Sequence, residues 1–168
     1  MFEQWYQHDS HRLFNYIAYR VSDRATAEDL MAQACEKAVR HLDQYDPARG
    51  TMNAWMFGIG REVLRDHFRR VGRLPLMVPL ADQPPVISRG ATPEERAERA
   101  DQFRRVMAHM NRLNPDEQEA VALRYGGALT YKEIAALLGT TTNRVGVLLH
   151  RAINKLREAL LAEEAEND

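Results

Sequence analysis

The sequence predicts an all-α protein in which a proline-rich linker joins two small helical domains. In both halves of the chain, apolar residues recur at intervals of three and four, the spacing of a single helix face. No segment alternates apolar and polar residues for long enough to form a strand. Most of the prolines fall between residues 75 and 93, where they fix φ and remove backbone donors. We therefore expect a domain over 1–74, a linker over 75–92 and a second domain over 93–168.

The composition narrows the class of protein. The 168 residues, 45% of them hydrophobic, suffice for one domain or two small ones. A net charge of −1 argues against a wholly basic nucleic-acid coat protein but leaves local patches open. Cys35 is the single cysteine, which excludes an internal disulfide and a thiolate metal cage. Without a long apolar run or a signal-peptide layout, we expect a soluble cytoplasmic protein. Because the histidines are scattered and no serine or cysteine lies in a nucleophile motif, we expect no enzyme activity, cofactor or metal.

Three helices are expected in the first domain. The apolar face of the first comprises Phe2, Trp5, Tyr6, Leu13, Tyr16 and Ile17. Thr26, followed three residues later by Asp29, is a start signal for the second helix. The turn residues of 45–50 end that pattern, and a third apolar face begins at Met52.

Start signals also mark the helices of the second domain. Thr92, Asn114 and Thr130 are each followed three residues later by a glutamate, the pattern of a capping box. The segment 131–150 fits a helix-turn-helix, with Ala135 where the helices cross and Gly139 in the turn. The residues expected to face inward are Ile134, Leu138, Val145, Leu148, Leu149, Ala152 and Leu156. An ordinary helical hairpin is the alternative.

In a helix-turn-helix the start of the second helix enters the major groove of DNA. The residues expected to face outward there are Thr141, Thr142, Asn143, Arg144, Gly146, Val147, His150 and Arg151. Asn143 suits a bidentate contact to adenine, and the methyl groups of Thr142 or Val147 suit a thymine methyl. The cations expected to contact phosphate are Arg144, Arg151, Lys155 and Arg157, although a solvated face explains Arg157 equally well.

A second basic patch lies over 61–73, where five arginines outnumber two acids. Arg61, Arg65 and Arg69 repeat every four residues and so share a helix face. Phe68 and Tyr45 bring aromatic rings close to these arginines in the sequence, and this combination is typical of single-strand binding. A role in the core is the alternative for these aromatic residues, and for Trp55 we prefer it.

Both halves together resemble the extracytoplasmic-function group of bacterial RNA polymerase sigma factors, which keeps only regions two and four. The resemblance is carried by RATAEDL (24–30), by 41–70, by LNPDEQEAVALRY (113–125), by TYKEIAALLG (130–139) and by LLHRAINKLREAL (148–160). It implies a promoter-specificity subunit that binds core RNA polymerase and promoter DNA and is commonly held inactive by an anti-sigma factor.

The resemblance also implies roles for particular residues. The helix matching 27–39 would dock on the polymerase clamp through Asp29, Met31, Ala32, Gln33 and Glu36. Region two would melt the minus-ten element and contact it through Tyr45, Arg49, Arg61, Arg65, Arg69 and Arg70. Region four would bind the minus-thirty-five element as duplex. The sequence departs from the usual family residues at Ala32, Gln33 and Cys35, at Glu62, and at 146–148.

Two other functions remain compatible with the sequence. A helix-turn-helix regulator acting without polymerase would keep Asn143 and the arginines but need no clamp-docking face. A sigma mimic that sequesters an anti-sigma factor would need apolar faces between the domains and no contact with DNA.

Overall fold

The computed structural model describes residues 1–21, 23–71 and 92–168. Within these ranges the chain forms helices and turns without a strand, which confirms the all-α prediction. The predicted linker, apart from Thr92, lies outside the described residues. None of the helices in the described ranges is both long and apolar enough to cross a membrane.

The first module comprises α1 (Phe2–Arg20), α2 (Arg24–Arg40), the short helix η1 (Leu42–Gln44) and α3 (Met52–Val71). The three long helices pack against one another around the buried side chains of Leu13, Ile17, Leu30 and Met56. The prediction that Tyr6 joins this core is wrong. Its neighbour Trp5 is buried, but Tyr6 lies one position, about 100°, further round the helix, and 52% of it is exposed.

Helix α2 begins earlier than predicted. Its N-cap is Asp23, which accepts hydrogen bonds of 2.7 Å from both the backbone N–H and the hydroxyl of Thr26. Thr26 therefore lies inside the first turn and does not cap the helix. The sequence offers both residue types within one turn, and aspartate is as good a cap as threonine or better.

The cap gives a prediction for stability and its pH dependence. The hydrogen bonds from Thr26 lower the pKa of Asp23 below its ordinary value. The carboxylate therefore stabilises the fold above its unfolded pKa of about 3.9, and this contribution is lost as the pH falls through the lower, folded pKa. We expect Asp23→Ala to lower the free energy of unfolding by about 1 kcal/mol at neutral pH.

Urea unfolding across the acid range measures this effect. Asp23→Asn is the matched control, because it keeps a capping oxygen but does not titrate. It should retain most of the stability at pH 7 and lose less than the natural chain on acidification. Equal stability of Asp23→Ala and the natural chain at pH 7 would contradict the assignment.

The second module comprises α4 (Pro93–Met107), η2 (Met110–Arg112), α5 (Pro115–Val121), the π-helical turn η3 (Ala122–Gly126), α6 (Tyr131–Leu138) and α7 (Thr142–Asn167). All three predicted capping boxes are present, with the reciprocal bonds between Thr92 and Glu95, Asn114 and Glu117, and Thr130 and Glu133. Helices α5 and α6 both pack against α7, and α4 meets α7 where Arg105 pairs with Glu164 at 3.1 Å.

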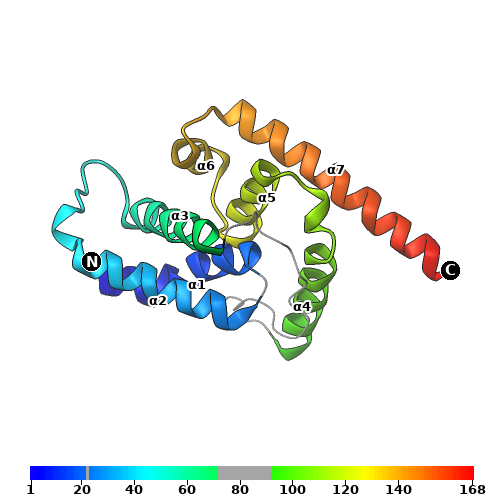
Figure 1. Ribbon diagram of the computed structural model, residues 1–168, viewed down its shortest axis with the longest axis horizontal. Helices are drawn as coiled ribbons and strands as arrows, with labels where there is room; N and C mark the ends of the chain where they lie inside the picture. The colour runs from blue at the N-terminus through cyan, green and yellow to red at the C-terminus, as the bar shows by residue number, and fades with distance from the viewer. Residues whose placement is uncertain (22, 72–91) are drawn as a thin grey trace.

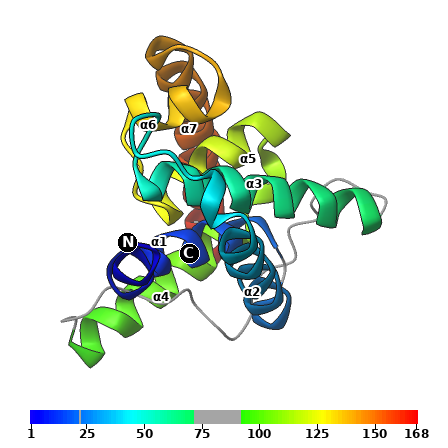
Figure 2. The ribbon, with the colours of Figure 1, turned by 90° about the vertical axis from the view of Figure 1, so that its left-hand side faces the viewer.

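The two modules pack directly against each other (Figures 1 and 2), so that one hydrophobic core runs through both. Helix α1 lies along η3, and α3 meets α6. Gly126 makes the close approach possible, since a Cβ atom there would lie 2.9 Å from the backbone oxygen of Asn15. A Cβ atom on Gly127 would lie 2.7 Å from the ring of Phe57.

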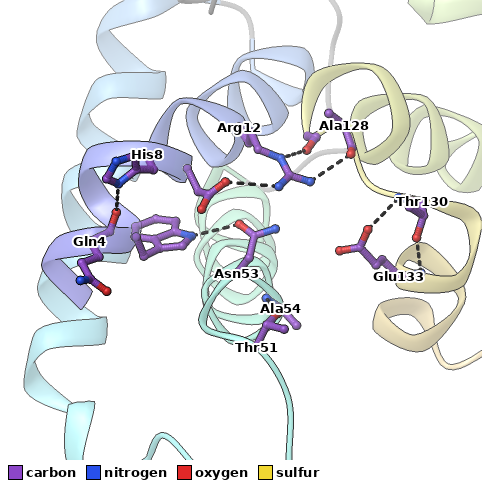
Figure 3. A network of polar contacts seen from close by, with 12 residues as sticks. Gln4, His8, Arg12, Thr51, Asn53, Ala54, Ala128, Thr130 and Glu133 are labelled. Atoms are coloured by element: carbon purple, nitrogen blue, oxygen red, sulfur yellow. Dashed lines mark hydrogen bonds and ion pairs between the residues drawn. The ribbon is translucent and has the colours of Figure 1, made fainter. Parts of the chain in front are cut away.

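Buried and partly buried polar groups tie this interface together. Glu119 of α5 accepts hydrogen bonds from the Tyr16 hydroxyl (2.6 Å) and from Arg61 Nε (2.9 Å), and its second oxygen lies 3.1 Å from Arg20 Nε. Burial and the Glu119 carboxylate raise the pKa of Tyr16 well above its ordinary value, so the phenol remains a donor. Arg12 donates to the backbone oxygens of Gly127 and Ala128 (Figure 3). We call Tyr16, Arg20, Arg61 and Glu119 the Glu119 cluster.

Candidate nucleic-acid interface

Helices α6 and α7 form the predicted helix-turn-helix. Helix α6 ends at Gly139, whose φ of 67° is the left-handed conformation that glycine adopts without strain. Thr141 then caps α7, its hydroxyl accepting from the Arg144 N–H at 3.1 Å. The residues predicted to face inward are buried, apart from Leu138, which is partly buried against the core. The turn and the inward face are therefore as predicted.

The outward residues at the start of α7, predicted to contact DNA and called the reading face below, are mostly open to solvent. Thr142, Asn143, Arg144, His150 and Arg151 are exposed, while Gly146 and Val147 are half-buried. The Thr141 side chain is exposed as well, but its hydroxyl already accepts the capping bond. Figure 2 shows the turn between α6 and α7 at the opposite end of the molecule from α2. The structure thus brings these residues together on one surface.

Lys155 lies in a different environment from the other predicted phosphate contacts. Its ammonium group is 2.6 Å from the Glu117 carboxylate, which belongs to the α5 capping box and is 1% exposed. The Lys155 side chain is itself 43% exposed. Its charge thus compensates a buried carboxylate, whereas Arg157 is exposed and contacts Asn154. A buried charge is costly without such a partner.

The arginines of α3 divide into two groups. Arg65, Arg69 and Arg70 are exposed, and Arg69 pairs with Asp66 at 3.4 Å on the same helix. Arg61 shares their face but belongs to the Glu119 cluster and also donates to the Leu137 backbone oxygen at 3.2 Å. Of the three arginines predicted to share a helix face, the second module covers only Arg61. Burial and the nearby Arg70 lower the pKa of His67, so this imidazole adds little charge to the patch at neutral pH.

Tyr45 lies in the loop between η1 and α3. Its hydroxyl donates to the Gly50 backbone oxygen at 3.1 Å, and its ring centroid is 5.4 Å from that of Trp55. The loop residues 47–52, Tyr45 and Met1 line a shallow hollow of about 560 Å³, with Arg49 exposed at its edge. Trp55 packs against the core with part of its ring exposed, as the preferred alternative predicted.

The residues of α2 predicted to meet polymerase lie on or beside its solvent-exposed side, and one of them, Met31, also packs against the core. Asp29, Ala32 and Glu36 are exposed, and Met31 and Gln33 are partly exposed. Gln33 donates to Asp29 at 2.8 Å, and Glu36 pairs with Arg40. Lys37 of this helix reaches Glu62 of α3 at 3.0 Å, so Glu62 joins the two helices. Cys35 is half-buried, and burial raises the pKa of its thiol, the opposite of what a reactive thiolate needs.

Sequence reasoning missed two residues of these surfaces. Glu119 was not singled out, although it organises the contact between the modules. Tyr131 was noted only as part of a helix start, yet its exposed ring lies beside Thr142, Asn143 and Gly146 on the reading face. Its place immediately after the Thr130 cap was the available signal, since the first turn of α6 points toward the start of α7.

Family models match both modules: Sigma-70 region 2 over residues 5–74 and Sigma-70, region 4 over residues 109–158. The extracytoplasmic-function RNA polymerase sigma factor BldN of Streptomyces coelicolor is 29% identical over 95% of this chain and 60% of its own length. The RNA polymerase sigma factor CarQ of Myxococcus xanthus is 26% identical over 98% of this chain and 92% of its own. The chain belongs to the sigma-70 family, and relatives that it resembles, such as BldN, are extracytoplasmic-function sigma factors. It spans about three fifths of the length of BldN.

Solved structures have the same fold. The sigma factor RpoE of Bartonella quintana, solved in complex with the anti-sigma factor NepR, superposes with a TM-score of 0.71. The two chains are 22% identical, and the alignment covers 95% of this chain and 96% of the other. CnrH, solved in complex with the cytosolic domain of CnrY, gives a TM-score of 0.65 at 22% identity, over 95% of this chain and 86% of the other.

Proposed function

We propose that this chain is a sigma factor that binds core RNA polymerase and directs it to promoters. It recognises and melts promoter DNA, acts without catalysing a reaction itself, and works in the cytoplasm where the chromosome lies. The observation that carries this proposal is the presence of sigma-70 regions two and four in order on one chain, each folded.

The proposal gives each exposed surface one step of initiation. The α2 face, with Asp29, Met31, Ala32, Gln33 and Glu36, docks on polymerase. Tyr45, Arg49 and the exposed arginines of α3 hold the opened minus-ten strand, because rings stack on bases while guanidinium groups contact phosphates. The reading face of α7 binds the minus-thirty-five element as duplex. Arg61 reaches DNA only after the Glu119 cluster opens.

A regulatory partner accompanies this role. RpoE and CnrH are each solved with a partner protein, named as an anti-sigma factor for RpoE. We extend such a partner to this chain, which would then be held from polymerase until a signal releases it.

The decisive experiment is reconstitution with core polymerase. The purified chain should co-elute with core polymerase and support transcription from a promoter selected by the complex. Binding to duplex DNA without polymerase would favour a helix-turn-helix regulator. Binding to neither would leave the sigma mimic as the better explanation. Replacing Glu36 and Gln33 on the α2 face should weaken co-elution, whereas replacing Asn143 should not.

Salt dependence tests the role of the α3 arginines. Each phosphate contact releases about one counterion, so log K falls with log salt concentration by a slope of about 0.7 per contact on single strands. We expect the Arg65→Ala and Arg69→Ala double variant to bind a forked minus-ten duplex, with polymerase present, more weakly and with a slope lower by 1 to 2 units.

A matched control is available on the second module. Arg96 and Arg99 of α4 are exposed cations outside the proposed DNA surfaces, and their double alanine variant should leave the slope unchanged. An unchanged slope in the Arg65 and Arg69 variant would refute the placement of the melted strand on α3.

A further inference from the structure

The reading face is not flat. Between the start of α6 and the first turns of α7 lies a shallow hollow of about 500 Å³. The residues that line it are Tyr131, Thr142, Asn143, Gly146, Val147, His150 and Arg151. The lining contains no carboxylate, and Arg144 is exposed nearby, so the surroundings favour a polyanion.

Gly146 is responsible for the shape of this hollow. It lies inside a helix, where glycine is less stable than alanine, so a packing or functional reason is expected. A Cβ atom at this position would lie 3.8 Å from Tyr131 Cε2, in ordinary contact. Crowding therefore does not require glycine here. The absence of a side chain at Gly146 leaves space between the Tyr131 ring and the Val147 side chain.

Two walls of the hollow, the Tyr131 ring and the Val147 side chain, are apolar and held in place, and polar side chains complete the lining. The Arg124 guanidinium lies 5.3 Å from the centroid of the Tyr131 ring, and Arg124 also donates to the Leu129 backbone oxygen at 2.9 Å. The Tyr131 ring is thereby fixed on one side of the space. The Val147 methyl groups, which are stiff at χ1, form another side.

The shape and chemistry point to one base. Thymine alone presents a methyl group in the major groove, and apolar contact is how proteins read it. Cytosine at the same place would present an amino donor and no methyl group, so it would lose the apolar contact with Tyr131 and Val147, and the Thr142 hydroxyl and the Asn143 amide oxygen are the side-chain acceptors that the lining offers to its amino group.

We propose that the hollow around Gly146 receives the 5-methyl group of a thymine in the upstream promoter element and sets the base preference of this chain there. The inference rests on the proposed binding of duplex DNA by the second module. Asn143, one turn before Val147, lies where it can contact an adjacent base pair.

Deoxyuridine substitution tests the proposal, because it removes the methyl group and leaves the pairing of the base unchanged. A duplex is first selected by the full chain from a random library, and each thymine is then replaced singly. Binding is followed by fluorescence anisotropy at low ionic strength. We expect one replacement to weaken binding about fourfold, the effect of one buried methyl group, and the others to have little effect.

The variant Gly146→Ala locates the effect. It should fold at least as well as the natural chain and lose the discrimination between thymine and deoxyuridine. Gly58→Ala is the matched control, because it makes the same substitution within α3, where no atom lies within 4 Å of the added Cβ. It should retain the discrimination.

Each other outcome overturns the proposal. If no thymine is sensitive to loss of its methyl group, or if Gly146→Ala discriminates as before, the hollow does not read thymine, although the chain can still be a sigma factor. If the chain binds no duplex with or without polymerase, the proposed duplex recognition fails with it.

Discussion

Replacing Glu119 by alanine is expected to lower the stability of the arrangement in which the two modules pack together by about 3–5 kcal/mol. The substitution leaves the guanidinium groups of Arg20 and Arg61 without their shared carboxylate and the Tyr16 hydroxyl without its acceptor. The Glu119 side chain is only 13% exposed and that of Arg20 only 9%, so water replaces the lost contacts poorly. The modules should separate, because separation returns these groups to solvent.

Two measurements follow this change. The radius of gyration from small-angle X-ray scattering should increase, and the free energy of unfolding should fall. Glu28→Ala is the matched control, since Glu28 also pairs with an arginine, Arg24 at 2.9 Å, but its side chain is 58% exposed. Exposed pairs of this spacing contribute about 0.3–0.5 kcal/mol. A chain that stays equally compact and stable without Glu119 would show that the cluster does not hold the modules together.

Gly126→Ala is expected to be the second most damaging substitution. The added Cβ atom would lie 2.9 Å from the Asn15 backbone oxygen, and helix α1 cannot move that oxygen without shifting as a whole. Overpacking of this kind costs about 1–3 kcal/mol. Because the clash lies between the modules, the loss should again appear as separation.

Thermal unfolding and scattering measure this effect too. Gly58→Ala provides the contrast, because alanine is the better helix former and the new methyl group meets nothing. It should raise stability by up to about 1 kcal/mol. If both glycine substitutions shifted stability in the same direction and by the same amount, the close packing at Gly126 would not matter to the fold.

Local features of the fold were predictable from the sequence because short-range physics determines them. The capping boxes at Thr92, Asn114 and Thr130 form as predicted, since each needs only residues three positions apart. The left-handed Gly139 and the buried face of α7 follow from the same reasoning. The misplaced start of α2 arose from choosing between two suitable caps, Asp23 and Thr26.

Contacts between distant segments were not predictable in this way. The periodicity of α3 places Arg61 on one face with Arg65 and Arg69, but it contains no information about which other segment covers Arg61. Only the approach of α5 makes Arg61 a partner of Glu119, 58 positions away. The hollow beside Gly146 likewise depends on where Tyr131 of another helix lies.

The packing of α1 against η3 has a consequence for the energetics of initiation. The minus-ten and minus-thirty-five elements are about 25 base pairs apart, or ~85 Å of B-DNA at 3.4 Å per step. Among the residues that the structure describes, the longest helix, α7 with 26 residues, spans only about 39 Å. For the proposed function, the two modules therefore have to move apart before one chain occupies both elements. Under that function, only molecules whose two modules have separated can form the complete promoter complex. The apparent affinity for the promoter is then reduced in proportion to the fraction of such molecules.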